Sequence, residues 1–198
     1  MDYLKAKEYI IGKLSKELDP RLTYHSIFHS LDVLQASEYL ATEEKIAERD
    51  KLLLFTAAVF HDSGMLRTYL GHEEASTHIV DEVLPLFGYD AEDIEIIKGM
   101  ILATKLPQAA NSDLQRIICD ADLDYLGRND FFMIAHQLKY EWEMMKFRKT
   151  TLREWYELQI NFLGNHRYLT NTARRLREQK KQENLKQVQE LVCFMRES

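Results

Sequence analysis

Residues 51–64 read KLLLFTAAVFHDSG, an almost unbroken apolar run that ends in a histidine, an aspartate and a Ser-Gly pair. Apolar residues all round a helix are typical of one buried in the middle of a domain. Ser63-Gly64 favours the end of that helix, so we predict a central buried helix over about 48–61. Its terminal imidazole and carboxylate need partners, because burying such groups unpaired costs free energy.

The composition favours helices through all 198 residues. The chain has only 7 Gly and 3 Pro, whereas average usage would give roughly twice and three times as many. Apolar residues recur at helical spacing, and no alternating run is long enough to demand a strand. We predict an all-α fold in a single domain, a helical bundle with a core at about 22–130 and additional C-terminal helices at about 131–198.

Turn and capping residues set the expected ends of the helices. Asp19-Pro20 ends the first, Pro85 is expected to kink the fourth, Gly88 to stop it, and Asp90 to cap the fifth. The predicted ranges are 3–18, 26–40, 48–61, 73–87, 91–104, 113–122, 130–147 and 151–163, with a terminal helix beyond 170. In that last helix the predicted apolar stripe is Leu176, Leu185, Val188 and Leu191. We favour one solvated face, and a short coiled-coil contact in a homodimer is the alternative.

Charge and apolar runs limit the partners. A net charge of −6 argues against binding to a nucleic acid duplex, but a bound cation would still allow a small phosphorylated substrate. The N-terminal MDYLKAKEYI has no signal-peptide core, and the longest apolar run, 52–60, is too short for a membrane span. We expect a cytoplasmic protein whose two thiols, Cys119 and Cys193, are buried and reduced.

Three segments carry histidines and carboxylates in a suggestive order. His25 and His29 lie four residues apart and share a helix face. His61-Asp62 follows the buried helix, and the carboxylates at alternate positions are Asp120, Asp122 and Asp124. Each segment alone is more typical of a helix cap, or of a buried polar side chain with its hydrogen bonds made, than of a metal site. Together they favour a divalent cation, with mixed imidazole and carboxylate ligands suiting Zn, Mn, Fe or Co better than Ca or Mg.

These motifs resemble the HD-domain superfamily of metal-dependent phosphohydrolases. The resemblance rests on YHSIFHSLDVL at 24–34, LLLFTAAVFHDSG at 52–64 and IICDADLDYLG at 117–127. GHEEAS at 71–76, ATKLP at 103–107, DADLDYLGR at 120–128 and QINFLGNHRYLT at 159–170 resemble a bacterial subgroup of predicted HD-type phosphohydrolases. The resemblance implies an HD-domain helical bundle over most of the chain.

The resemblance also implies roles for individual residues. The implied metal ligands are His29, His61, Asp62 and Asp122, with Asp122 chosen because it follows Ala121. His25 matches the acid that protonates the leaving oxygen in related cyclic-nucleotide phosphodiesterases. Dinuclear relatives often have a further histidine where this chain has Thr104, so one ion is the favoured number. A second ion, bridged by Asp62, stays open, and Mn, Zn, Fe, Co, Ni and Mg are all candidates.

Other polar residues near the motifs are candidates for substrate binding. His72 suits a second metal or a phosphate, but is as typical of a solvated helix start. Lys105 is a candidate to stabilise phosphoryl oxygens, although a cation also complements a helix C-terminus. Arg67 and Arg128 are candidate phosphate clamps. His166 belongs to the subgroup pattern and is equally typical of a helix-end loop.

The implied activity is hydrolysis of a small nucleotide-like phosphomonoester or phosphodiester. The metal would acidify a water that Asp62 or Asp122 orients, and His25 would protonate the departing oxygen. Lys105 would stabilise the equatorial oxygens. The alternatives are an HD-type di-iron oxygenase, which needs further ligands, and a non-catalytic sensor of metal or nucleotide.

Overall fold

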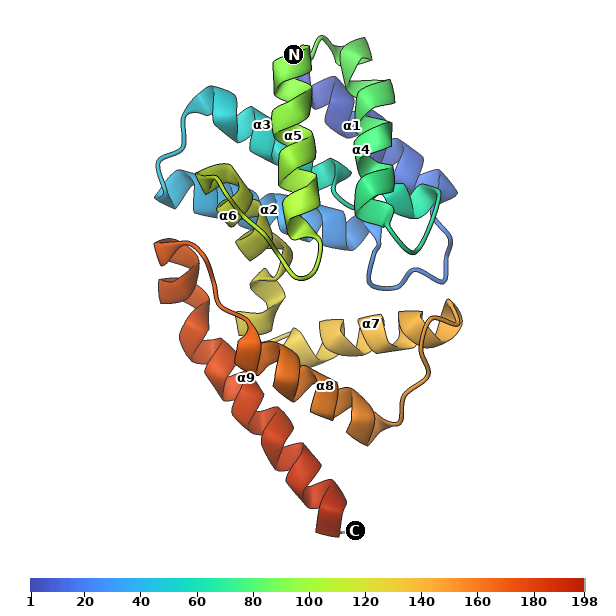
Figure 1. Ribbon diagram of the computed structural model, residues 1–198, viewed down its shortest axis with the longest axis vertical. Helices are drawn as coiled ribbons and strands as arrows, with labels where there is room; N and C mark the ends of the chain where they lie inside the picture. The colour runs from blue at the N-terminus through green and yellow to red at the C-terminus, as the bar shows by residue number, and fades with distance from the viewer. Residues whose placement is uncertain (198) are drawn as a thin grey trace. The chain divides into compact units, whose positions relative to one another are not determined.

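The computed structural model describes the backbone of residues 1–197 and side chains up to residue 195. Over this range it contains helices and short 3-10 turns but no strand, which confirms the all-α prediction (Figure 1). The elements are α1 (Tyr3–Glu17), α2 (Ile27–Glu43), α3 (Glu48–Phe60), η1 (Ser63–Leu66), α4 (His72–Val83), η2 (Leu84–Phe87), α5 (Ala91–Thr104), α6 (Asp113–Asp122), η3 (Asp124–Gly127), α7 (Phe131–Met144), α8 (Leu152–Asn165) and α9 (Asn171–Glu197).

The helices gather into two compact units. The first comprises Met1–Pro20 and His25–Asp122, and therefore contains α1 to α6. The second comprises Arg21–Tyr24 and the chain from Leu123 onward, with η3 and α7 to α9. The expectation of one domain with a core at 22–130 stays a prediction.

The first unit is built around α3. Residues 53, 54 and 57–60 of this helix are fully buried, as expected for a helix that is apolar on every face. It packs against α1, α2, α5 and α6, which confirms the prediction of a central buried helix. The end of α3 therefore delivers the next two residues, His61 and Asp62, into the interior of this unit.

Local signals account for most helix boundaries. Gly88 adopts φ 76°, a left-handed conformation that favours glycine, and follows η2 as predicted. The Asp90 carboxylate accepts from the Asp93 backbone N–H at 2.8 Å, so its predicted N-cap is confirmed. Pro85 does more than kink α4, because the helix ends at Val83 and a 3-10 turn takes over.

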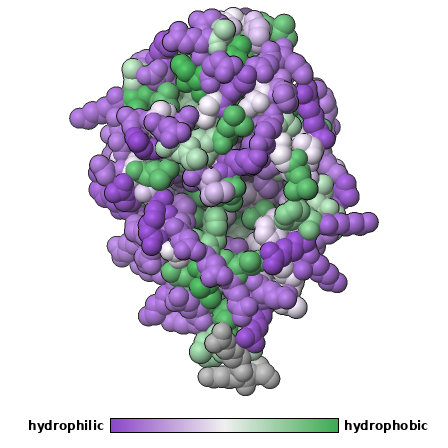
Figure 2. All heavy atoms as spheres, viewed as in Figure 1, coloured by the Kyte–Doolittle hydropathy of each residue, from purple (hydrophilic) through white to green (hydrophobic). Residues whose placement is uncertain are grey.

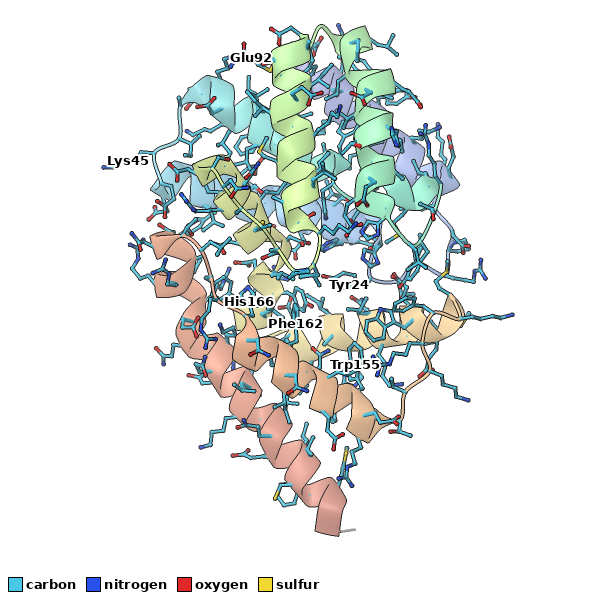
Figure 3. The ribbon with its side chains drawn as sticks, viewed as in Figure 1. Tyr24, Lys45, Glu92, Trp155, Phe162 and His166 are labelled. Atoms are coloured by element: carbon cyan, nitrogen blue, oxygen red, sulfur yellow. The ribbon has the colours of Figure 1, made fainter. Side chains whose placement is uncertain are left out.

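The second unit has its own core on α7, α8 and α9. Trp155 on α8 is fully buried and meets Trp142 of α7 edge-on, with ring centroids 5.2 Å apart. Thr151 begins α8 with a reciprocal capping box to Glu154, which satisfies two backbone donors at that end. Figure 3 shows Trp155 and Phe162 along α8 and His166 just beyond its end.

The terminal helix α9 differs in part from the predicted stripe. Val188 is buried, but Leu176 is 38% exposed, so its predicted place on the buried face is wrong. Lys181 is fully buried instead. Its ammonium donates to the His166 carbonyl at 2.8 Å, pairs with Glu178 at 2.9 Å and lies over the Tyr168 ring. These contacts give a buried cation the partners it needs, which an apolar pattern does not reveal.

The surface is largely polar in the view of Figure 2, where hydrophilic residues cover most of the face and apolar residues lie between them. Within the described residues no helix is both long and apolar enough to cross a bilayer. The predicted burial of both thiols is half right, because Cys119 is buried and Cys193 is exposed.

Candidate metal centre

The His-Asp pair lies at the point where α3 turns away. His61 is 1% exposed and Asp62 is 6% exposed, so both side chains are held out of water. His61 Nδ1 lies 2.8 Å from the Ala58 carbonyl, which as an acceptor requires the proton on Nδ1. In the neutral ring the Nε2 lone pair is therefore turned towards the neighbouring side chains. A histidine that binds a metal is oriented in this way by its other nitrogen.

Three side chains, from α2, α6 and the His-Asp turn, converge on this nitrogen. His61 Nε2 lies 3.3 Å from His29 Nε2 and 3.1 Å from Asp62 Oδ2. Asp122 Oδ1 lies 3.1 Å from His29 Nε2 and 3.6 Å from His61 Nε2. These are the four ligands that the sequence motifs single out, and α2, α3 and α6 bring them together.

The spacing and chemistry of the four groups fit one divalent cation. Ligand atoms about 2.0–2.2 Å from a cation stand about 2.8–3.6 Å from one another in tetrahedral or octahedral sites. The separations of 3.1–3.6 Å fall in that range. Asp62 Oδ2 is buried, makes no hydrogen bond of good geometry among the described residues, and has the ring nitrogens of His61 and His29 beside it at 3.1 and 3.5 Å. A bound cation would provide the partner that a buried carboxylate oxygen needs.

The charges around His61 and Asp62 depend on each other. Burial alone would lower the pKa of His61, but the carboxylates of Asp62 and Asp122 outweigh it and raise the pKa to about 9. Burial alone would raise the pKa of Asp62, but the adjacent His61 and His72 hold it well below its usual range. The cluster thus keeps a carboxylate ionised at its centre, as a cation site requires.

A second cluster shares Asp62. His25, Asp62 and His72 offer ligand atoms that lie within 4.8 Å of one another. His72 Nε2 is 3.3 Å from Asp62 Oδ1, the oxygen not directed at His61, and His72 Nδ1 is 3.2 Å from the Tyr69 carbonyl. His25 and His72 stack edge to face with centroids 5.1 Å apart. The two oxygens of Asp62 thus face two different sets of histidines.

The structure places the remaining carboxylates elsewhere. Asp120 is buried within the first unit. Asp124 belongs to the second unit, where Oδ1 accepts from Arg177 at 2.7 Å and Oδ2 lies 3.5 Å from Arg128. Of the three alternating aspartates, Asp122 is the one whose carboxylate faces His29.

The predicted substrate-binding cations all carry carboxylate partners. Lys105 at the end of α5 pairs with Glu74 of α4, and Arg67 pairs with Glu82 at 2.5 Å. Arg128 pairs with Asp130 at 2.8 Å within the second unit. Sequence reasoning missed these partners, because every one except Asp130 is distant in the chain or on another element. Paired side chains contribute less net positive charge to a phosphate than unpaired ones.

Two further predicted positions have local roles. Thr104, where dinuclear relatives often have a histidine, donates its hydroxyl to the Ile101 carbonyl at 2.8 Å. His166 caps the C-terminal end of α8, and its ring lies edge-on to Tyr168 at 4.7 Å. Neither residue belongs to the two histidine and aspartate clusters.

Comparison with protein families identifies the helical core. Residues 27–124, which contain α2 to α6, match the model of the HD domain. The chain therefore carries an HD domain and belongs to the HD-domain superfamily. The matched segment includes His29, the His61-Asp62 pair and Asp122.

Two known proteins are similar to this chain. An uncharacterized protein of Clostridium beijerinckii is 33% identical over 98 residues, which is 48% of this chain and 62% of that protein. A predicted HD superfamily hydrolase from an uncultured Thermotogales bacterium has the same fold, with a TM-score of 0.63 and 21% identity. That comparison covers 98% of this chain and 94% of the other.

Proposed function

We propose that this HD-domain protein is a metal-dependent phosphohydrolase that acts on a small, nucleotide-like phosphomonoester or phosphodiester. The observation that carries the proposal is the convergence of His29, His61, Asp62 and Asp122 at 3.1–3.6 Å. These residues would hold a divalent metal, which would supply an acidified water and neutralise phosphate oxygens. The HD domain matched by residues 27–124 supports the same class.

The chain's own groups support hydrolysis in three ways. Asp62 and Asp122 provide carboxylate oxygens that can orient an attacking water. Burial of His61 and Asp62 removes bulk water and strengthens electrostatic interactions around them. In an enzyme with a single ion, His25, which is half-buried beside His72, would donate a proton to the leaving oxygen.

The two oxygens of Asp62 support two ions. Its Oδ2 belongs to the His29 and His61 side, whereas its Oδ1 faces His72. We propose a first ion on the former side and a second on His25, Asp62 and His72. In this arrangement His25 is a ligand, and a single-ion enzyme would use it as the acid. Because Lys105 and Arg67 are already paired, a second ion would also supply the positive charge that a phosphate needs.

Metal reconstitution tests this proposal. The protein is stripped with a chelator, reloaded separately with Mn, Co, Ni, Zn, Fe and Mg, and assayed on phosphomonoesters and phosphodiesters. We expect turnover only in loaded protein. Replacement Asp62→Asn should lower metal content and reduce turnover by more than about a hundredfold, since even residues that merely orient ligands are worth ten- to a hundredfold.

Asp81→Asn is the matched control. Asp81 is an exposed carboxylate on α4 that pairs with Lys98, so its loss should change neither metal content nor turnover. Equal hydrolysis by stripped and loaded protein would contradict the proposal, as would full activity in Asp62→Asn.

A di-iron oxygenase is the second candidate, and the shared Asp62 favours it, because two clusters bridged by one carboxylate suit two irons. Iron-loaded protein would then consume oxygen in the presence of substrate. Hydrolysis of phosphoesters by Mn- or Mg-loaded protein without oxygen uptake would exclude this candidate.

A further inference from the structure

Ser76 connects α4 to the His-Asp turn through both of its hydrogen-bonding capacities. Its hydroxyl donates to the His61 carbonyl at 2.6 Å and accepts from the Gly64 backbone N–H at 2.7 Å. Ser76 is fully buried, so water cannot replace it. His61 comes directly before Asp62 and Gly64 lies two residues after it, so one hydroxyl holds the backbone on both sides of the shared aspartate.

Gly64 brings the same two elements into direct contact. A Cβ at this position would lie 1.9 Å from the His72 carbonyl oxygen and 2.7 Å from the Ser76 nitrogen. Only a residue without a side chain allows the turn to pack this closely on the first turn of α4. The distance between Asp62 and His72 is thus set by backbone packing.

His72 and Ser76 lie one helical turn apart on α4 and share a face. When Ser76 fixes the helix to the turn, His72 Nε2 comes to stand 3.3 Å from Asp62 Oδ1. The other set of ligands depends less on α4, because His29, His61 and Asp122 come from α2, the end of α3 and α6, and Ser76 reaches His61 only through its backbone carbonyl. His61 is also held by its own helix through Ala58.

We propose that Ser76, together with Gly64, is a positioning residue for the second metal site of His25, Asp62 and His72. It acts by fixing α4 against the His-Asp turn before any ion binds. This inference rests on the proposed function in that it assumes a second ion. The first site, on His29, His61, Asp62 and Asp122, has no ligand on α4 and depends less on Ser76.

The test is a calorimetric titration of chelator-stripped full-length protein with Mn²⁺. The unmodified protein should bind two equivalents in separable steps. Ser76→Ala removes the donor and the acceptor together and should weaken the second step by about tenfold or more, as loss of a ligand-orienting group does. The first step should weaken less, because His61 is also held by the Ala58 carbonyl and no first-site ligand lies on α4. Weakening of both steps to the same degree, or of neither, would overturn the proposal.

Thr77→Ala is the matched control on the neighbouring residue. Its hydroxyl donates to the Glu74 carbonyl within α4 and does not touch the turn, so both binding steps should persist. Adding Ser76→Ala to His72→Ala should cause no further loss in the second step, because Ser76 acts through His72. A further, independent loss would assign Ser76 a merely structural role.

A measurement on the unmodified protein avoids any loss of folding in the variants. The Gly64 amide should exchange slowly with deuterium before metal is added, since the Ser76 hydroxyl already accepts from it. Rapid exchange of that amide in stripped protein would contradict the proposal.

Failure of this inference differs from failure of the proposed function. Phosphoester hydrolysis with a single bound equivalent would overturn the positioning role alone. Two equivalents, selective loss in Ser76→Ala and no hydrolysis would overturn the function alone.

Discussion

Asp62 uses its two carboxylate oxygens differently. Oδ2 lies 3.1 Å from His61 Nε2, and Oδ1 lies 3.3 Å from His72 Nε2. An ionised aspartate is an acceptor with room for more than one partner per oxygen. A single residue at the end of a buried helix therefore belongs to both candidate ligand sets, and its charge governs the pKa of both histidines.

Protonation of His61 predicts how metal uptake depends on pH. In metal-free protein its pKa is raised to about 9, so the ring carries a proton at neutral pH, whereas a metal ligand must be neutral. Metal uptake at pH 7 should release protons. For each proton displaced, the apparent affinity for the metal should rise about tenfold per pH unit as the pH increases towards 9.

Calorimetry in buffers of different ionisation enthalpy counts the released protons. His78→Ala is the control, because it removes an exposed imidazole that belongs to neither cluster. Metal affinity that stays constant with pH below 9 would contradict the raised pKa of His61.

The two thiols should differ in reactivity. Cys119 is buried, its Sγ contacts the Ala103 carbonyl at 3.1 Å, and burial raises the pKa of its thiol. Cys193 on α9 is exposed. A maleimide should label one thiol rapidly in native protein and both after unfolding in urea, because the reactive form is the accessible thiolate. Cys193→Ser should abolish the rapid phase, and rapid labelling that survives this change would place Cys119 at the surface.

At the scale of elements, local capping explains where several helices begin. Thr151 and Glu154 satisfy each other's backbone N–H groups at the start of α8. At the start of α5 the Asp90 carboxylate accepts from the Asp93 backbone N–H. These signals are contained within three or four residues, which is why the sequence alone could place Asp90 as a cap.

Loss of the α8 cap should destabilise the protein measurably. Thr151→Ala removes the acceptor for the Glu154 N–H and should lower the free energy of unfolding by about 0.5–2 kcal/mol. Urea denaturation followed by circular dichroism measures the change. Thr42→Ala, in the last turn of α2, is the control and should have a smaller effect, since alanine has the higher helix propensity. An equal loss of unfolding free energy in both variants would show that the Thr151 cap does not stabilise the protein.

At the scale of the whole molecule, the chain contains two compact units with separate cores. The four predicted ligands and the second cluster all belong to the first unit. Trp155, the largest fully buried side chain, belongs to the second. Metal binding should therefore stabilise the fold through contacts between helices of the first unit.

Bound metal should raise the unfolding temperature. Ligands for one ion come from α2, α3 and α6, and unfolding separates them. At a free metal concentration about a hundred times the dissociation constant, binding adds about 2.7 kcal/mol to the free energy of unfolding. Scanning calorimetry with Mn²⁺ and with chelator measures the shift. Asp62→Asn should lose most of it, and Asp81→Asn should keep it. A shift of the same size in Asp62→Asn would place the stabilising ion elsewhere.

The sequence by itself determined the helices and which residues are candidate metal ligands. Apolar spacing, Gly88 and Asp90 act over a few residues, so the local pattern contains the information. Burial of Lys181 was not predictable from the pattern of α9. Of its partners only Glu178 lies on that helix, and Tyr168 and the His166 carbonyl lie before it in the chain. The same holds for Lys105 and Glu74, which are 31 residues apart.

Only the tertiary structure decided which of these residues meet. His29 and Asp122 are 93 residues apart, and the packing of α2 on α3 and α6 brings their ligand atoms to 3.1 Å. The pairing of His72 with Asp62 depends on Gly64 and Ser76, which hold α4 against the end of α3. Local pattern determines what a residue can bind. The close packing of helices determines distances of a few ångströms, and these distances decide whether a cation is held.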